Sequence, residues 1–181
     1  AAELFKLMRA DYIVANAEAR EVSMRRILSG ARETFRHPRI LIRGSLIGVV
    51  IGAVPGVGSA VANLLAYSEA RRTEPRPERF GTGDPRGVIA AEAANSSSEG
   101  GSMATLLALG IPGGGATAIM LGAFAMHNIT GGPRFIAENT PLVYAIIFSN
   151  LVQSLALMVV GIVFIYLAGA IVKTPVRVLV P

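Results

Sequence analysis

The most polar stretch of an otherwise apolar chain begins at Glu92 and ends just after Glu99, and its side chains suit the binding of a charged solute. Within it, Asn95, Ser96 and Ser97 can donate hydrogen bonds to a carboxylate or offer oxygens to a small cation. The two flanking carboxylates are candidates for ion coupling, because they can take up protons or balance a cation. Such groups are costly in lipid unless they face a cavity or a partner. We therefore expect a substrate site here, the alternative being hydrogen bonds that only hold neighbouring helices together.

Two glycine–proline clusters, at residues 52–58 and 110–115, lie where a membrane helix should run unbroken. Proline removes a backbone donor and glycine relaxes the chain, so each cluster should interrupt its helix. A break inside a bilayer is tolerated only where the freed backbone groups are buried in protein or line a cavity. Secondary transporters hold solutes and coupling ions at such breaks. The two clusters therefore predict part of a transporter.

The half-helices that restart after these clusters should provide anion sites, because their first N–H groups and positive dipole ends are unpaired. Hydroxyl groups in the first turn of each half-helix would add donors. The alternative is a pair of kinks that only shape the helix bundle. The residues expected to contact substrate are Pro55, Gly56, Gly58 and Ser59 in the first cluster and Pro112, Gly113, Gly114 and Thr117 in the second.

Three segments, Pro55–Ser59, Asn95–Ser97 and Pro112–Thr117, are expected to meet around one cavity. Three separate polar interruptions in lipid are each expensive unless they share a wet or substrate-filled space. Around such a cavity, the half-helix ends would face substrate carboxylates and Asn95 would supply directional hydrogen bonds.

Other kinds of chemistry find no support in the sequence. There is no cysteine, and His37 and His127 are too far apart for metal-ligand spacing. No nucleophile–base pair is visible either, so we expect neither an enzyme nor a metal site. The expected cofactor is none, apart from a coupling cation, H⁺ or Na⁺.

The composition is that of a membrane protein. Apolar residues make up 52% of the chain and charged residues only 16%, against about 25% in soluble domains. The net charge of +5 comes largely from residues 1–45, which hold nine Lys/Arg against five Asp/Glu. In a membrane protein this excess indicates a cytoplasmic flank rather than a nucleic-acid surface. Because the chain opens at Ala1, without an initiator methionine, we expect a piece of a longer polytopic protein.

Residues 1–45 are predicted to form a cytoplasmic basic amphipathic segment, whose helix lies either on the membrane surface or in a solvated loop. Residues 46–68 are apolar, with arginine-rich flanks on both sides. If both flanks are cytoplasmic, the segment must enter and leave on one side, which predicts a re-entrant hairpin with its tip at Pro55 and Gly56. A kinked spanning helix is the alternative.

Residues 46–181 together are predicted to form one transmembrane transporter half. Residues 69–87 form a polar linker, and residues 88–128 form broken membrane helices, interrupted at 95–101 and at 111–115. Residues 142–172 contain no Asp, Glu, Lys, Arg or His over 31 positions and predict a transmembrane helix. The fold class is therefore all-α: a polytopic integral membrane protein with broken helices or re-entrant helical hairpins.

Small residues repeat at one helical spacing before the first break. Gly44, Gly48, Gly52 and Gly56 fall four residues apart, on one helix face. A face without side chains lets another helix approach closely. We interpret this ridge as structural.

Several motifs, in order, resemble the large membrane (permease) subunit of the tripartite tricarboxylate transporter family. The resemblance covers nearly the whole chain from about residue 38. The chain departs from the pattern after Asn95, where the family often has a second Asn and this chain has the run Ser96–Ser98, which leaves the exact carboxylate open. The motifs are the stretches 43–48, 52–58, 80–83, 87–95, 100–101 and 109–113, with a closing stretch at 175–181.

The resemblance implies an ion-gradient-driven, multi-pass permease of the bacterial inner (cytoplasmic) membrane that takes up tricarboxylates or related citrate-like carboxylates. Its implied partners are a small membrane subunit and a periplasmic solute-binding protein. It also implies that this chain is a C-terminal-half fragment, one half of an inverted-repeat transporter. The alternative functions are another broken-helix secondary transporter, or a channel or structural membrane component.

Overall fold

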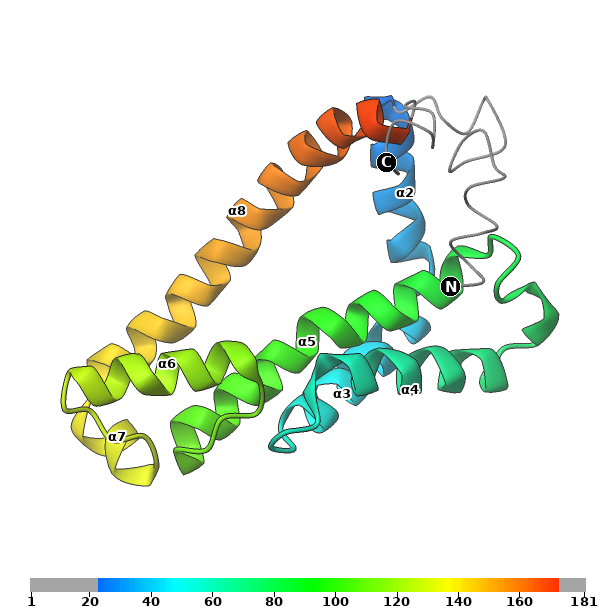
Figure 1. Cartoon of the computed structure of the whole chain (residues 1–181). Coiled ribbons are helices and arrows are strands. Elements are labelled where there is room, and N and C mark those ends of the chain that lie inside the picture. Colours follow the sequence, from blue (N-terminus) through cyan, green and yellow to red (C-terminus); the bar gives the residue numbers. More distant parts are fainter. Residues whose placement is uncertain (1–22, 173–181) are drawn as a thin grey trace, which may run out of the picture. The chain divides into compact units, whose positions relative to one another are not determined.

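The computed structural model describes residues 23–172, with side chains up to residue 169, and every regular element in that part of the chain is helical (Figure 1). The expected all-α class is thus confirmed. Residues 1–22 of the predicted amphipathic segment, and residues 173–181, lie outside the described residues. The chain divides into two units, residues 33–147 and residues 1–32 with 148–181. The elements are α2 (Met24–Arg36), α3 (Pro38–Gly52), α4 (Gly58–Thr73), η2 (Pro77–Arg79), α5 (Pro85–Leu109), α6 (Gly115–Met126), α7 (Pro133–Glu138) and α8 (Thr140–Val172).

Two helices, α2 and α8, each extend from one unit into the other. α2 is the helix expected from the basic amphipathic pattern, and it buries none of its residues. α8 contains the only stretch of the described chain that is long and apolar enough to cross a membrane, the 30 residues Thr140–Gly169. Its length matches the predicted transmembrane helix, whereas further membrane passes remain a prediction.

In the unit of residues 33–147, α3 and α4 form a helical hairpin whose turn is residues 53–57. Its open end is held by Arg43 of α3, whose Nη1 lies 3.4 Å from Thr73 Oγ1 and 3.9 Å from Glu69 Oε1 at the end of α4. The turn falls at the predicted proline–glycine tip. Both helices are longer than residues 46–68 would allow, so the hairpin includes five residues of the expected polar linker, 69–73.

The ridge of glycines along α3 is the surface on which α5 packs. A Cβ on Gly44 would lie 2.7 Å from the Ala90 carbonyl oxygen, and a Cβ on Gly48 or Gly52 would overlap backbone atoms of α5. The fourth predicted member, Gly56, has no such neighbour within 4 Å, because it lies in the turn after the helix. Three of the four glycines therefore serve the expected close approach.

α5 runs unbroken from Pro85 to Leu109, so the predicted interruption at residues 95–101 is wrong. The polar side chains there do not unwind the helix, because they bond to its own carbonyls. Ser97 Oγ donates to the Ala93 carbonyl at 2.7 Å, and Ser98 Oγ donates to the Asn95 carbonyl at 2.7 Å. The glycine that should relax the chain, Gly101, is instead required by packing, since a Cβ would overlap Val49 of α3. Tertiary contact thus outweighs the low helix propensity of serine and glycine.

The second predicted break, at residues 111–115, is present between α5 and α6. α5 ends at Gly110, whose φ of 72° is left-handed and whose Cα packs directly on Gly131. Beyond the break, α6, α7 and the start of α8 close around a second apolar core. Its buried members are Leu106, Leu107, Phe124, Phe135 and Val143.

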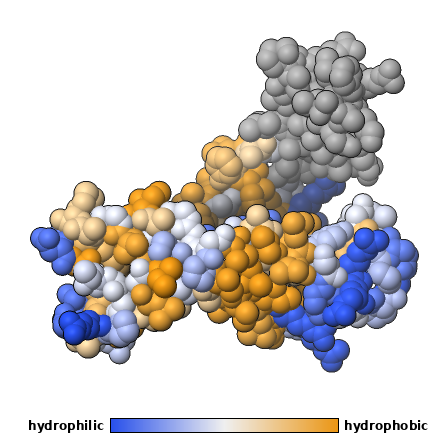
Figure 2. Space-filling view, turned by 60° about the horizontal axis from the view of Figure 1, so that its bottom comes forward, coloured by the Kyte–Doolittle hydropathy of each residue, from blue (hydrophilic) through white to orange (hydrophobic). Residues whose placement is uncertain are grey.

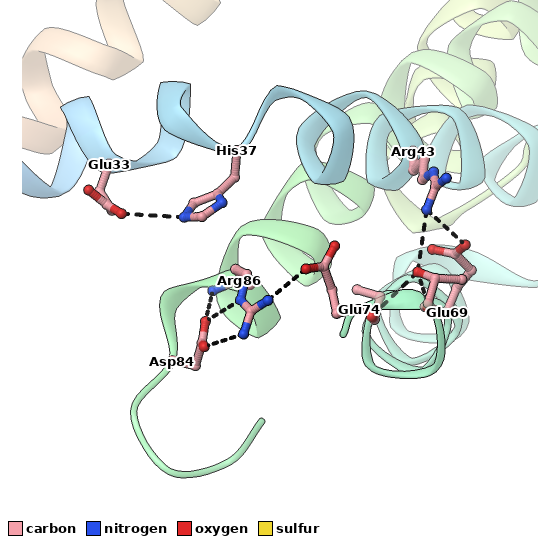
Figure 3. A network of polar contacts seen from close by, with 9 residues as sticks. Glu33, His37, Arg43, Glu69, Glu74, Asp84 and Arg86 are labelled. Atoms are coloured by element: carbon pink, nitrogen blue, oxygen red, sulfur yellow. Dashed lines mark hydrogen bonds and ion pairs between the residues drawn. The ribbon is translucent and has the colours of Figure 1, made fainter. Parts of the chain in front are cut away.

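A network of charges fixes the connection from α4 to α5 (Figure 3). Arg86, with 10% of its side chain exposed, bonds Asp84 through Nε at 2.9 Å and Nη2 at 2.6 Å, and bonds Glu74 through Nη1 at 2.6 Å. Its guanidinium also lies 5.5 Å from the centre of the Phe80 ring. Asp84 is at the same time the N-cap of α5, accepting the Arg86 amide at 3.0 Å. One arginine therefore joins the end of α4, the linker and the start of α5.

The surface of this unit changes sharply in polarity (Figure 2). Over α3 and α4 it is strongly apolar, with Leu46, Val50 and Leu64 each more than 60% exposed. At the end of α4 and the start of α5 it is strongly hydrophilic. This pattern matches an apolar environment around the hairpin and water at its open end.

Because α3 and α5 pack closely, the neighbouring residues Gly100 and Gly101 should respond differently to substitution. We expect Gly101→Ala to destabilise the protein by about 1–3 kcal/mol, because its new methyl group meets backbone. Gly100→Ala should be neutral or stabilising by up to about 1 kcal/mol, since no atom lies within 4 Å of its Cβ position. Thermal unfolding in detergent measures both. Equal effects of the two substitutions would contradict this packing.

The Asp84–Arg86 pair predicts a specific acid sensitivity. Hydrogen bonds from Arg86 lower the pKa of Asp84 from 3.8 to about 2. Stability from this carboxylate is therefore complete above about pH 4 and is lost as the pH falls through about 2. Asp84→Asn keeps an N-cap but removes the charge, so it should cost about 1.5–3 kcal/mol at neutral pH and abolish this part of the pH dependence. Helix unfolding followed by circular dichroism from pH 6 to 2 checks it, and an unchanged pH profile would count against the pair.

Candidate functional site

The first predicted segment is a glycine turn whose two ends differ in exposure. Gly56 and Gly58 have φ of 77° and 75°, in the left-handed region that favours glycine. Pro55 and Gly56 are exposed, whereas Ser59 is half-buried in the first turn of α4. The tip of the turn is therefore exposed, whereas the start of α4 is partly covered.

The second predicted segment is the restart of the chain after α5. Gly113 is buried, Pro112 and Gly114 are half-buried, and Thr117 is only 1% exposed. Thr117 Oγ1 accepts the Gly114 amide at 3.0 Å and donates to the Gly114 carbonyl at 2.9 Å. It also lies 2.8 Å from Ser102 Oγ on α5, so the restart of α6 is held on the middle of α5 by hydroxyl groups.

The end of α3 meets this second segment on α5. A Cβ on Gly113 would lie 2.6 Å from the Gly52 carbonyl oxygen and 2.5 Å from Ser102 Oγ. One turn further along α5, Thr105 Oγ1 donates to the Ala53 carbonyl at 2.9 Å. The two glycine–proline clusters thus approach each other through buried oxygens. The sequence reasoning missed Ser102 and Thr105, although both fall on the helix face of Ser98, four and seven residues on.

The Asn95–Ser97 stretch lies earlier on α5. Asn95 is half-buried, Ser96 is exposed, and the half-buried Ser97 faces Gly48 of α3. From Asn95 to Ser102 the helix rises about 10 Å. The structure therefore joins residues 52 and 53, at the start of the first cluster, to Gly113 of the second segment and to Thr105 of α5 respectively, while Asn95–Ser97 lies two turns away along α5.

Asn95 is level with Ser59 across the α4–α5 pair. The two helices are antiparallel, because the end of α4 bonds the start of α5, and Tyr67 of α4 packs on Gly87 of α5. Ser59 precedes Tyr67 by eight residues and Asn95 follows Gly87 by eight. Since both helices rise 1.5 Å per residue, Ser59 and Asn95 lie at about the same height.

The two ion-coupling candidates, Glu92 and Glu99, are both exposed. They lie one helical turn on either side of Asn95. Among the described residues there is no group of three or more His, Cys, Asp or Glu that could hold a metal ion.

Two hollows in this unit lie away from the predicted residues. One, of about 500 Å³, lies between Gly110, Gly131 and the end of α6. The other, of about 310 Å³, lies beside the Arg86 network and is lined by His37, Glu74 and Arg76 among others. A cavity shared by all three predicted segments therefore stays a prediction.

Comparison with known proteins gives the chain a family. The family model described as "Tripartite tricarboxylate transporter TctA family" matches residues 1–181. An uncharacterized 52.8 kDa protein in the TAR-I ttuC' 3'region of Agrobacterium vitis is 35% identical over 167 residues, which cover 90% of this chain and 33% of that protein. An uncharacterized protein in the TAR-II ttuC' 3'region of the same organism is 34% identical over 134 residues, covering 74% of this chain and 55% of that protein.

The chain therefore spans about a third of the length of the first relative and about half of the second. No solved structure matches it. Because the family model covers all of its residues, the chain belongs to the tripartite tricarboxylate transporter TctA family.

Proposed function

We propose that this chain is part of the large permease subunit of a binding-protein-dependent secondary transporter, which takes up tricarboxylates or related citrate-like carboxylates along an ion gradient. Its partners would be a small membrane subunit and a periplasmic solute-binding protein, in the bacterial inner membrane. The observation that carries the proposal is the match of a transporter family model to residues 1–181. The 30-residue apolar stretch in α8 supports the membrane setting.

The two chain breaks support an anionic substrate. α4 and α6 each begin at a glycine directly after a break, Gly58 and Gly115, with no charged side chain in the first turn. Their free N–H groups and positive dipole ends favour carboxylates. Asn95, level with the start of α4, would add two directional donors through its amide.

The hairpin of α3 and α4 supports a re-entrant element. The helices are 15 and 16 residues long, about 22–24 Å each, which is less than the roughly 30 Å of a hydrocarbon core. Arg43, in the second turn of α3, contacts Thr73 at the end of α4. Both ends would therefore lie on one side of the membrane, with the glycine turn at depth.

Substrate binding predicts a defect confined to uptake. Asn95→Ala should weaken carboxylate uptake while the protein still inserts at normal levels, because it removes donors to a charged group. Losing such a bond corresponds to about a 10- to 150-fold loss in affinity. Uptake of radiolabelled citrate by cells containing the full permease, its small subunit and its binding protein measures this.

The matched control is Val88→Ala, which changes an exposed residue of the same helix and should leave uptake unchanged. Normal citrate, malate and succinate uptake by the Asn95→Ala variant would remove this amide from the substrate site. Transport without saturation, or without need of a binding protein, would instead indicate a channel or another transporter class.

The re-entrant hairpin predicts that both of its ends label from one side. Single cysteines at positions 45 and 73, as Ser45→Cys and Thr73→Cys, should react with a membrane-impermeant maleimide only from the cytoplasmic face. The reason is the contact between the start of α3 and the end of α4. Labelling of the two positions from opposite faces would establish a spanning helix instead.

A further inference from the structure

Among the described residues, one buried side-chain polar atom has no hydrogen-bond partner: Oδ1 of the half-buried Asn63, in the second turn of α4. A buried amide oxygen without a donor is destabilising, because it has lost its bonds to water. Buried polar groups nearly always have a hydrogen-bond partner, so an exception of this kind indicates that a ligand binds there. Nothing in the amino-acid pattern distinguished this asparagine from a surface residue.

The position of Asn63 brings it towards the residues already proposed to bind solutes. It lies one turn after Ser59 and one turn before Tyr67, whose ring packs on Gly87 and so marks the side of α4 that faces α5. Helical side chains lean towards the N-terminus of their own helix. Because α4 and α5 are antiparallel, the side chain of Asn63 inclines along the helix axis towards the level of Asn95. The side chain of Asn95 inclines in the opposite direction, towards the level of Asn63.

The chemistry of the unpaired atom selects its ligand. An amide oxygen only accepts hydrogen bonds, so a carboxylate substrate, which also only accepts, leaves it unsatisfied. A proton is no alternative, since an amide does not titrate in the physiological range. A small metal cation satisfies it, and backbone and Asn carbonyls are common ligands of such hard cations. Divalent ions generally add carboxylate ligands, whereas the two carboxylates within about one turn of Asn95, Glu92 and Glu99, are exposed.

We infer that Asn63 Oδ1 binds the coupling cation, that this cation is Na⁺, and that Ser59 and Asn95 provide further oxygens for it. The inference rests on the proposed transport function and adds to it the identity of the ion and the residue that holds it. It also gives Asn95 a double role. Its amide carries an acceptor for Na⁺ and two donors for a substrate carboxylate, so both solutes would bind next to each other with opposite charges.

The test measures Na⁺ binding without transport. The full permease, purified with its small membrane subunit, is unfolded thermally in NaCl and in KCl at equal ionic strength. The wild type should show a Na⁺-specific rise in melting temperature that saturates with concentration. Asn63→Leu, close in shape but without the oxygen, should fold and require at least about 10-fold more Na⁺ for the same rise.

Two further variants make the result decisive. Asn63→Asp retains an oxygen and adds a negative charge, so it should bind Na⁺ at least as tightly as the wild type, even if Asn63→Leu does not fold. Leu64→Ala, an exposed neighbour on α4, should leave the Na⁺ response unchanged.

An unchanged Na⁺ response in Asn63→Leu overturns the inference, as does a weakened response in Asn63→Asp. A wild type that takes up citrate with no Na⁺-specific effect overturns the inference and leaves the proposed function standing. A Na⁺ response in a protein that transports no carboxylate retains the cation site and overturns the proposed function.

Discussion

The direct contact between the backbones of α3 and α5 is the constraint on which the rest of this unit depends. Where Gly44, Gly48, Gly52 and Gly101 face the partner helix, there is no room for even a methyl group. The contact fixes the relative height of the two helices to within a residue, because a shift would bring Cβ atoms against backbone. The relative height of α3 and α5 in turn determines where along α5 the end of α3 packs, and where the residues before α6 pack.

Close helix packing also explains why the polar residues of α5 do not break it. In an apolar environment, each hydroxyl group requires a partner, and the nearest acceptors are carbonyls one turn back or on the adjoining helix. Thr105 Oγ1 contacts both kinds of acceptor: the carbonyl of Gly101 one turn back, and the carbonyl of Ala53 just after α3. Serine and threonine thus hold α3, α5 and α6 together here while keeping the helix intact. The side-chain oxygen of Asn63, by contrast, has no partner among the described residues.

The sequence alone predicted the features that depend on local chemistry. The combinations of proline with glycine at residues 55–56 and 110–113 each lie at a break between helices, and the four-residue glycine spacing reports a helix face directly. The features that it missed depend on the partner helix. Gly100 and Gly101 look identical in sequence, yet only the second faces α3, and Asn63 becomes unusual only when the fold removes its oxygen from water. A polar run such as 95–101 likewise becomes a helix or a break according to what packs against it.

The arrangement around Arg86 has a mechanical consequence. One guanidinium bonds the end of α4, the residue capping α5 and, through its face, the ring between them. The eleven residues from Glu74 to Asp84 therefore cannot act as a hinge, since their two ends are held by the same side chain. Any displacement of the hairpin must carry the start of α5 with it as one rigid body. Bending within this unit is then left to the break after Leu109, where Gly110 and Gly131 touch without side chains between them.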